Sequence, residues 1–156
     1  MGVTSITNEY ASSVAATRLF KALILDAQNL VPKLVPNSSV EILHGDGGPG
    51  TTIKINNPDG TYVKPRFDAL DKDNNSCKYT WIEGEPLKDN IEAISFEVKV
   101  EDCSQGGGSV VKTKIEFHTT GEAGPKEEEV KANTEKLLIV YKLIETYLVE
   151  NPAAYA

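Results

Sequence analysis

The spacing of apolar residues along this chain changes twice, and each change marks a different kind of element. Residues 3–12, VTSITNEYAS, alternate weakly between apolar and polar positions and predict a strand. Residues 15–36, AATRLFKALILDAQNLVPKLVP, have helical spacing instead. They predict two short helices, the second of which is bounded by Pro32 and Pro36.

The middle of the chain consists of period-two runs separated by the turn sequences NNPDGT, DKDNNS and SQGGGS. The alternating apolar positions are Val40 and Ile42; Ile53 and Ile55; Cys77, Tyr79 and Trp81; Ile94, Phe96, Val98 and Val100; and Val111, Thr113, Ile115 and Phe117. We expect about six antiparallel strands here. One of them, YVKPRFDAL, contains Pro65, which lacks an amide proton and therefore indicates an edge strand or a bulge.

The last third of the chain changes to a helical period. Pro125–Asn151, PKEEEVKANTEKLLIVYKLIETYLVEN, lacks glycine and has acidic residues in its opening turn, where the helix dipole favours them. Pro125 is expected at the first helical position. Around Leu137–Ile144 the helix is apolar nearly all round, so this part is either deeply buried or covers something other than its own sheet. The order of elements predicts one α+β domain over residues 1–156, with a concavity between a curved sheet and the helix.

Composition narrows the class of protein. The chain has 156 residues, of which 40% are hydrophobic and 25% charged, as in a globular domain. Its net charge of −7 makes it a poor general binder of nucleic acid. It has neither an apolar run long enough for a membrane span nor a secretory signal, so we expect a cytosolic protein. Cys77 and Cys103 lack the spacing of a metal site and are expected to be free thiols; we expect no metal and no cofactor.

A glycine-rich stretch, EILHGDGGPGTTIKI, fits the G-x-G-x-x-G pattern of dinucleotide sites. A dinucleotide site needs a helix after the glycines, whereas TTIKI begins a strand. The Lys and Ser or Thr that a P-loop requires after its last glycine are missing too. We therefore interpret the stretch as a rigid hairpin loop consisting of Gly45, Asp46, Gly47, Gly48, Pro49 and Gly50.

Five stretches and the long helix together resemble a known family. ATRLFKALILDAQNLVPKLVP, SVEILHGDGGPGT, WIEGEPL, FHTTGE and IETYLVENPAAY closely resemble, in order, the plant pathogenesis-related proteins of class ten, relatives of the major birch-pollen allergen. The resemblance covers essentially the whole chain. It implies a seven-stranded antiparallel sheet wrapped around a long carboxy-terminal helix, with two short helices forming a V.

The same resemblance implies a function. Proteins of this class have a large internal cavity for hydrophobic or amphiphilic plant molecules, such as cytokinins, flavonoids and sterol-like compounds, and are cytosolic and induced by stress or pathogens. This chain departs from the family in a shortened stretch before YVKPRF, in Cys77 at a usually aromatic position, and in HTTGE where the family has HTKGD. We expect these changes to alter the shape of the cavity and to leave the fold intact.

We accordingly expect a monomeric carrier of small amphiphilic molecules. The expected ligand-binding residues are Leu23, Val31, Ile55, Tyr62, Arg66, Cys77, Tyr79, Trp81, Phe96, Val98, Val111, Leu137, Val140 and Tyr141. Trp81 and Phe96 fit packed core as well as cavity wall. Arg66 is a candidate anchor for a ligand carboxylate or hydroxyl if its side chain turns inward.

A ribonuclease is the main alternative, with RNA as a partner only in that case. The resemblance implies the glycine loop, Glu92, Glu145 and Tyr147 as its residues. Two carboxylates and a tyrosine could move protons, but this set contains no arginine or histidine to stabilise a phosphorane.

Two further alternatives stay open. Some relatives catalyse condensations with a lysine, a tyrosine and carboxylates inside the cavity; Tyr79 fits the tyrosine, whereas Lys112 and Lys114 are expected to face solvent. An interaction protein acting through the exposed glycine loop would instead leave the cavity small or filled.

Overall fold

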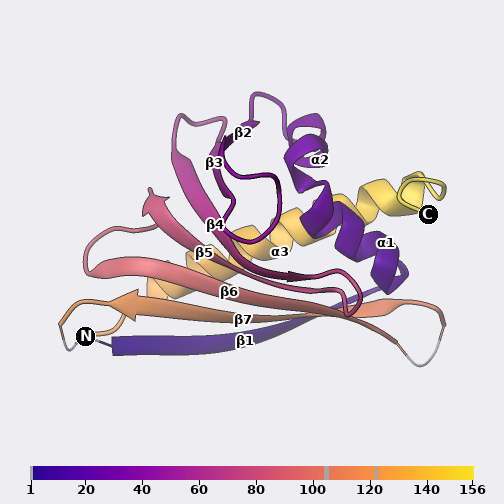
Figure 1. Cartoon of the computed structure of the whole chain (residues 1–156). Coiled ribbons are helices and arrows are strands. Elements are labelled where there is room, and N and C mark those ends of the chain that lie inside the picture. The colour runs from indigo at the N-terminus through magenta and orange to yellow at the C-terminus, as the bar shows by residue number, and fades with distance from the viewer. Residues whose placement is uncertain (1, 104–105, 122) are drawn as a thin grey trace.

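A seven-stranded antiparallel sheet dominates the molecule (Figure 1). The computed structural model describes residues 2–103, 106–121 and 123–156, and its strands lie in the order β1-β7-β6-β5-β4-β3-β2. The strand bounds are β1 Gly2–Ser12, β2 Ser39–His44, β3 Thr52–Asn56, β4 Tyr62–Asp71, β5 Ser76–Gly84, β6 Ile91–Asp102 and β7 Ser109–Thr119. Strands β2 to β7 form a meander, and β1 pairs with β7 at the far edge. The predicted α+β class is confirmed.

The segment between β1 and β2 folds into the two predicted short helical arms. Helix α1 (Ala16–Phe20) continues directly into a π-helical turn, η1 (Lys21–Leu25), and α2 (Ala27–Leu34) follows after a break at Asp26. Pro32 lies inside α2, so the prediction that it bounds this helix is wrong. In so short a helix the missing amide proton leaves a single carbonyl without its bond, and α2 continues for two more residues.

The long helix α3 (Glu127–Glu150) crosses the concave side of the sheet (Figure 1). It begins two residues after Pro125, so the expected place of that proline at the first helical position is wrong; Lys126 is the N-cap. The Glu129 carboxylate accepts the amide proton of Lys126 at 3.2 Å, which satisfies a donor that the helix start would leave free. Tyr141 and Ile144 of α3 are buried against the sheet.

The end of the chain is attached to the first helical arm. The Arg18 guanidinium donates hydrogen bonds of 3.0 Å to the carbonyl oxygens of Leu148, Asn151 and Ala154. Tyr155 donates its hydroxyl proton to Asp26 at 2.5 Å. Because the last carbonyls of a helix lack partners within the helix and carry partial negative charge, a guanidinium is a fitting cap for them.

The two faces of the sheet differ in chemistry. On the concave face, β6 and β7 bury their apolar positions and form one core with the helices; these residues are Ile94, Phe96, Val98, Val100, Val111, Ile115 and Phe117. Lys112 and Lys114 are exposed on the other face, as predicted. The convex face has a chain of hydrogen bonds across four strands, formed by Asp68, Thr80, Ser95 and His118 with distances of 2.5, 3.2 and 3.0 Å.

Pro65 is at a bulge. The register between β4 and β5 shifts between Lys64 and Pro65 and again between Phe67 and Ala69. The bulge alternative predicted from the proline is confirmed, and the edge alternative is wrong because β4 lies between β3 and β5. A bulge changes which side chains point inward, and this matters for the site.

Candidate functional site

Four aromatic rings line the concave face of the sheet opposite α3. Tyr79 stacks on Phe96 with ring centroids 4.7 Å apart, and Trp81 lies 4.6 Å from the same ring. Phe67 adds an edge-to-face contact with Tyr79 at 6.4 Å. Because β-strand side chains alternate, Cys77, Tyr79 and Trp81 of β5 all lie on this face.

These residues differ in how far they are exposed to solvent. Phe96 and Cys77 are 2% and 3% exposed, whereas Tyr79 and Trp81 remain half-buried although they pack against the core. Leu137 and Val140 of α3 are half-buried in the same way. The incompletely packed side chains therefore come from both the sheet and the helix that faces it.

Tyr79 has the most distinctive environment among these residues. Burial raises the pKa of its hydroxyl well above the ordinary value, with smaller contributions from Tyr141 and Cys77. Within residues 2–103, 106–121 and 123–156, no hydrogen bond engages this hydroxyl. By contrast, the Tyr141 hydroxyl is 2.9 Å from Thr113 Oγ1. Tyr79 thus has an uncommitted donor and acceptor in an apolar setting, which a ligand can use.

The raised pKa of the Cys77 thiol makes this residue unreactive. It is a free thiol on the concave face, and burial raises its pKa to about 12. The thiol therefore stays protonated at neutral pH and contributes apolar surface where the resemblance led us to expect an aromatic ring.

Most of the predicted lining residues meet in one cluster. Those that belong to the core or pack directly against it are Leu23, Val31, Cys77, Tyr79, Trp81, Phe96, Val98, Val111, Leu137, Val140 and Tyr141.

The other three predicted residues lie elsewhere. Arg66 is exposed and paired with Asp68 at 2.8 Å, so it does not turn inward as a ligand anchor. Tyr62 donates its hydroxyl proton to Glu83 at 2.7 Å on the outer side of β4. Ile55 is half-buried and lies outside the core cluster.

The sequence analysis missed Phe67 and Thr113 as members of this site. Phe67 ends the aromatic row, and Thr113 holds the Tyr141 hydroxyl. The alternation Val63, Pro65, Phe67 in β4 was the signal available for Phe67.

A hollow of about 550 Å³ lies between the first helical arm, the glycine loop and β4. It is lined by Ile24, Leu25, Ala27, Gln28, Asp46, Gly47, Gly48, Pro49, Ile53, Phe67, Leu70 and Lys72. Phe67 belongs both to this hollow and to the aromatic row, so the hollow lies directly beside the interior.

The glycine loop is the hairpin connection between β2 and β3, as expected. Gly45, Gly47 and Gly50 have positive φ angles. Internal partners occupy its amide protons: Gly47 donates to Thr51 Oγ1, Gly48 to Asp46 Oδ1 and Gly50 to the carbonyl of Phe67. A phosphate cradle needs free amide protons, so this loop is a poor one.

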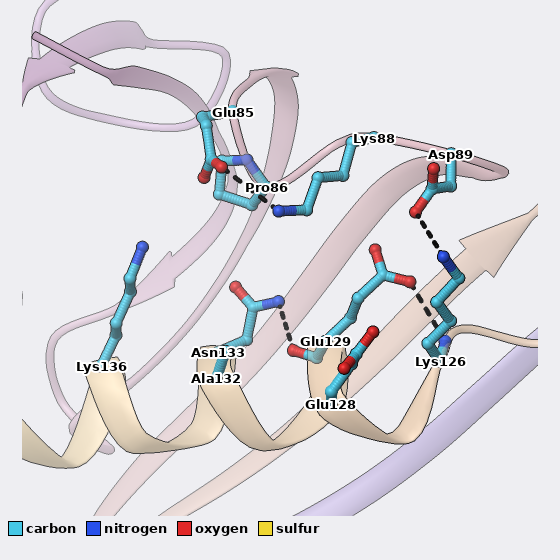
Figure 2. A pocket seen from close by; sticks show the side chains of 10 residues that line it. All are labelled: Glu85, Pro86, Lys88, Asp89, Lys126, Glu128, Glu129, Ala132, Asn133 and Lys136. Carbon is cyan, nitrogen blue, oxygen red and sulfur yellow. Dashed lines mark hydrogen bonds and ion pairs between the residues drawn. The ribbon is translucent and has the colours of Figure 1, made fainter.

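A second hollow of about 370 Å³ lies at the other end of the molecule, between the β5–β6 loop and the start of α3 (Figure 2). Its walls are Glu85, Pro86, Lys88, Asp89, Lys126, Glu128, Glu129, Ala132, Asn133 and Lys136. The walls are mainly charged, which distinguishes it from the aromatic interior.

The residues of the ribonuclease alternative do not lie together in one site. Glu92 is exposed and lies beside His118 of β7, whereas Glu145 accepts the hydroxyl proton of Tyr10, which pairs with Val111 of β7. Seven residues of one strand separate these two positions, or roughly 20 Å. Tyr147 is half-buried against the core.

In the described part of the chain, no group of three or more His, Cys, Asp or Glu side chains is placed to hold a metal ion. No described helix is both long and apolar enough to span a bilayer.

Comparison with known proteins places this geometry in context. Residues 1–151 match the model of the pathogenesis-related protein Bet v 1 family. The chain is 49% identical over 160 residues to the major allergen Pru av 1 of Prunus avium and 46% identical to the major strawberry allergen Fra a 1-A of Fragaria ananassa, with 99% of each chain covered in both cases.

Solved structures agree with this at the level of the fold. The crystal structure of Ara h 8.0201 matches with a TM-score of 0.88 and 36% identity, covering 96% of this chain and all of the other. Norcoclaurine synthase from Thalictrum flavum, in complex with dopamine and hydroxybenzaldehyde, matches with a TM-score of 0.73 and 22% identity, covering 96% and 88%. The second likeness concerns the fold alone.

Proposed function

This chain belongs to the pathogenesis-related protein Bet v 1 family, and from that premise we propose that it binds small amphiphilic molecules between the concave face of its sheet and α3. Membership supports a general ligand-binding or defence-related role. The chemistry of the interior favours ligand binding, because large apolar surfaces surround a few polar groups there.

One observation carries this proposal. Tyr79 has an unengaged hydroxyl, although it is held in an apolar row and its pKa is raised by burial. A hydroxyl without a hydrogen-bond partner in an apolar core lowers the free energy of unfolding by about 1–3 kcal/mol, unless water or a ligand supplies the bond. The half-buried Trp81, Leu137 and Val140 provide the apolar surface that such a ligand would cover.

The proposal extends to ligand class and setting. We propose flat or ring-containing amphiphiles with a hydrogen-bonding group, such as cytokinins, flavonoids and sterol-like compounds, because aromatic rings stack favourably on them. We further propose a monomeric carrier in the cytoplasm of plant cells that takes part in defence.

A dye-displacement titration tests the proposal. A solvatochromic dye should gain fluorescence when mixed with the folded protein, and a cytokinin or a flavonoid should displace it in a saturable manner. If the dye shows no uptake by the folded protein, or none of these compounds displaces it, the carrier proposal fails.

A pair of tyrosine variants tests the carrying observation. Tyr79→Phe should weaken binding of a hydrogen-bonding ligand by about fivefold to tenfold, because one net hydrogen bond contributes about 1 kcal/mol. Tyr62→Phe removes the same atom from the outer side of β4 and should leave affinity unchanged. Calorimetric titration measures both, and equal affinities of the two variants would place the hydroxyl outside the site.

No specific observation favours the enzymatic alternatives. All described lysines keep some exposure, and none is buried in the interior as a condensation would need. The ribonuclease residues are spread along the sheet. Because the candidate catalytic residues lie apart, we favour a binding function over a catalytic one.

A further inference from the structure

Glu129 is the only buried charged side chain in the described part of the chain, at 7% exposure. It lies in the first turn of α3 and lines the smaller hollow. Figure 2 shows its carboxylate directed across the hollow towards the loop that contains Lys88 and Asp89.

Only one of the two oxygens of this carboxylate has a hydrogen-bond partner. Oε1 accepts the amide proton of Lys126, whereas Oε2 is buried and has no hydrogen-bond partner. One turn further along α3, the Asn133 side-chain amide donates to the Glu129 main-chain carbonyl at 2.9 Å and so supplies no donor to Oε2. A buried carboxylate oxygen without a donor is costly, so a donor is what this place lacks.

The lysines around the hollow are already occupied elsewhere. Lys88 pairs with Glu85 at 3.3 Å and Lys126 with Asp89 at 3.6 Å. Lys136 points away from Glu129 (Figure 2) and lies near enough to Asp59 to lower the pKa of that carboxyl, although hydrogen bonds from Thr61 lower it more. Pro86 and Ala132 add a small apolar surface.

We propose that this hollow binds an organic ammonium ion, whose N–H groups bond Glu129 Oε2 while a short alkyl chain lies on Pro86 and Ala132. A primary ammonium supplies N–H donors and a positive charge, which match a buried carboxylate oxygen that lacks a donor. Because Oε2 has almost no accessible surface, side chains around the hollow must move on binding. Such a movement costs little where it breaks only the ion pairs of Lys88 and Lys126, which lie at the surface.

The test is an NMR titration of the full chain with n-butylammonium chloride at constant ionic strength. The amide signals of Glu129, Asn133 and Lys88 should shift together and saturate, while the Trp81 indole signal stays unchanged. n-Butanol, which lacks the charge, and tetramethylammonium, which lacks N–H donors, should each bind at least about tenfold more weakly. If tetramethylammonium binds as tightly as n-butylammonium, the effect is only attraction to a protein of net charge −7, and the proposal is overturned.

A matched pair of variants assigns the contact. Glu129→Gln keeps an oxygen for the Lys126 amide proton, so the fold should persist, and the affinity for n-butylammonium should fall at least about tenfold. Glu127→Gln removes the same charge from an exposed position in the same turn and should leave affinity unchanged within about twofold. Equal losses in both variants, no saturable shift in the unaltered protein, or a response at Trp81 alone would each overturn the proposal. The dye titration of the interior is independent of all these outcomes.

Discussion

At the scale of single residues, the polar groups of the interior are held in their neutral forms. Burial raises the pKa of Tyr10 and of Cys77 to about 12, and it raises those of Tyr79 and Tyr141 as well. A raised pKa favours the protonated form, and for a thiol or a phenol that form is uncharged. In the proposed binding site, the hydroxyl of Tyr79 and the thiol of Cys77 are therefore donors without formal charge.

This neutrality predicts how binding depends on pH. The affinity for a ligand that does not ionise should stay constant between pH 6 and pH 9, because the raised pKa values lie above this range. Dye-displacement titrations across the range measure it. A clear loss of affinity by pH 9 would mean that an interior thiol or phenol ionises there.

The hydrogen-bond chain on the convex face supports a second residue-scale prediction. Thr80 is buried, donates to Asp68 at 2.5 Å and lies 3.2 Å from the Ser95 hydroxyl. Thr80→Val should lower the free energy of unfolding by about 1–3 kcal/mol, because two polar partners lose a bond. Thr7→Val, at an exposed position of β1, should change it by less than about 0.5 kcal/mol. Urea unfolding measures both variants, and an equal effect would show that the chain of bonds adds no stability.

Strand β4 shows where residue-scale prediction from the sequence ends. Cys77, Tyr79 and Trp81 were predictable, since an uninterrupted period of two fixes their common face. In β4 the sequence led us to Tyr62 and Arg66, whereas Phe67 faces the aromatic row. Tyr62 and Arg66 have the opposite phase from the alternation that contains Phe67, and a one-residue error in phase moves every side chain to the other face of the sheet.

At the scale of elements, Arg18 joins the first helical arm to the end of α3. Arg18→Ala should lower the free energy of unfolding by about 1–2 kcal/mol, because carbonyls at the helix end lose a charged donor. Amide exchange should speed up in residues 148–155. Arg66→Ala removes the other arginine, whose single partner Asp68 lies at the surface, and should cost under about 1 kcal/mol. Equal losses in the two variants would contradict a capping role.

The elements themselves were largely predictable, but their attachments were not. The acidic opening turn and the absence of glycine predicted α3 to within two residues at its start. The bonds from Arg18 connect residues 130 to 136 positions apart, and no local spacing encodes such a pairing. Likewise, Asp26, at the break between η1 and α2, accepts a hydrogen bond from Tyr155 at the far end of the chain.

At the scale of the whole molecule, the sheet order depends on contacts between distant segments. Local periods predicted about six antiparallel strands, and β2 to β7 pair in chain order as a meander. The pairing of β1 with β7 closes the sheet at one edge and sends the helical arms across to the other, where β2 lies. The family resemblance implied in advance only that a seven-stranded sheet wraps around the long helix and that two short helices form a V. The observed arrangement leaves α3 on the concave side of the sheet and attached to the first helical arm at its end (Figure 1).

From this arrangement we predict that α3 is the adjustable wall of the proposed binding site. Its half-buried Leu137 and Val140 lack full packing partners, whereas the glycine loop is fixed by its own hydrogen bonds. A ligand that fills the interior should therefore slow amide exchange chiefly in α3 and leave Gly45–Thr51 unchanged. At about 100 times its dissociation constant, it should also add roughly 2.7 kcal/mol to the free energy of unfolding.

Two variants of α3 test whether its inward-facing side chains contribute to ligand binding. Leu137→Ala should weaken ligand binding and destabilise the protein together, because it removes apolar surface from the interior. Ile139 lies two residues from Leu137 but is 65% exposed. Ile139→Ala should therefore change neither the binding free energy nor the free energy of unfolding by more than about 0.5 kcal/mol. Hydrogen exchange with and without ligand, combined with calorimetric titration of both variants, measures this. Protection that rises mainly in the glycine loop would move the site to the hollow beside that loop, since α3 contributes no residue to the walls there.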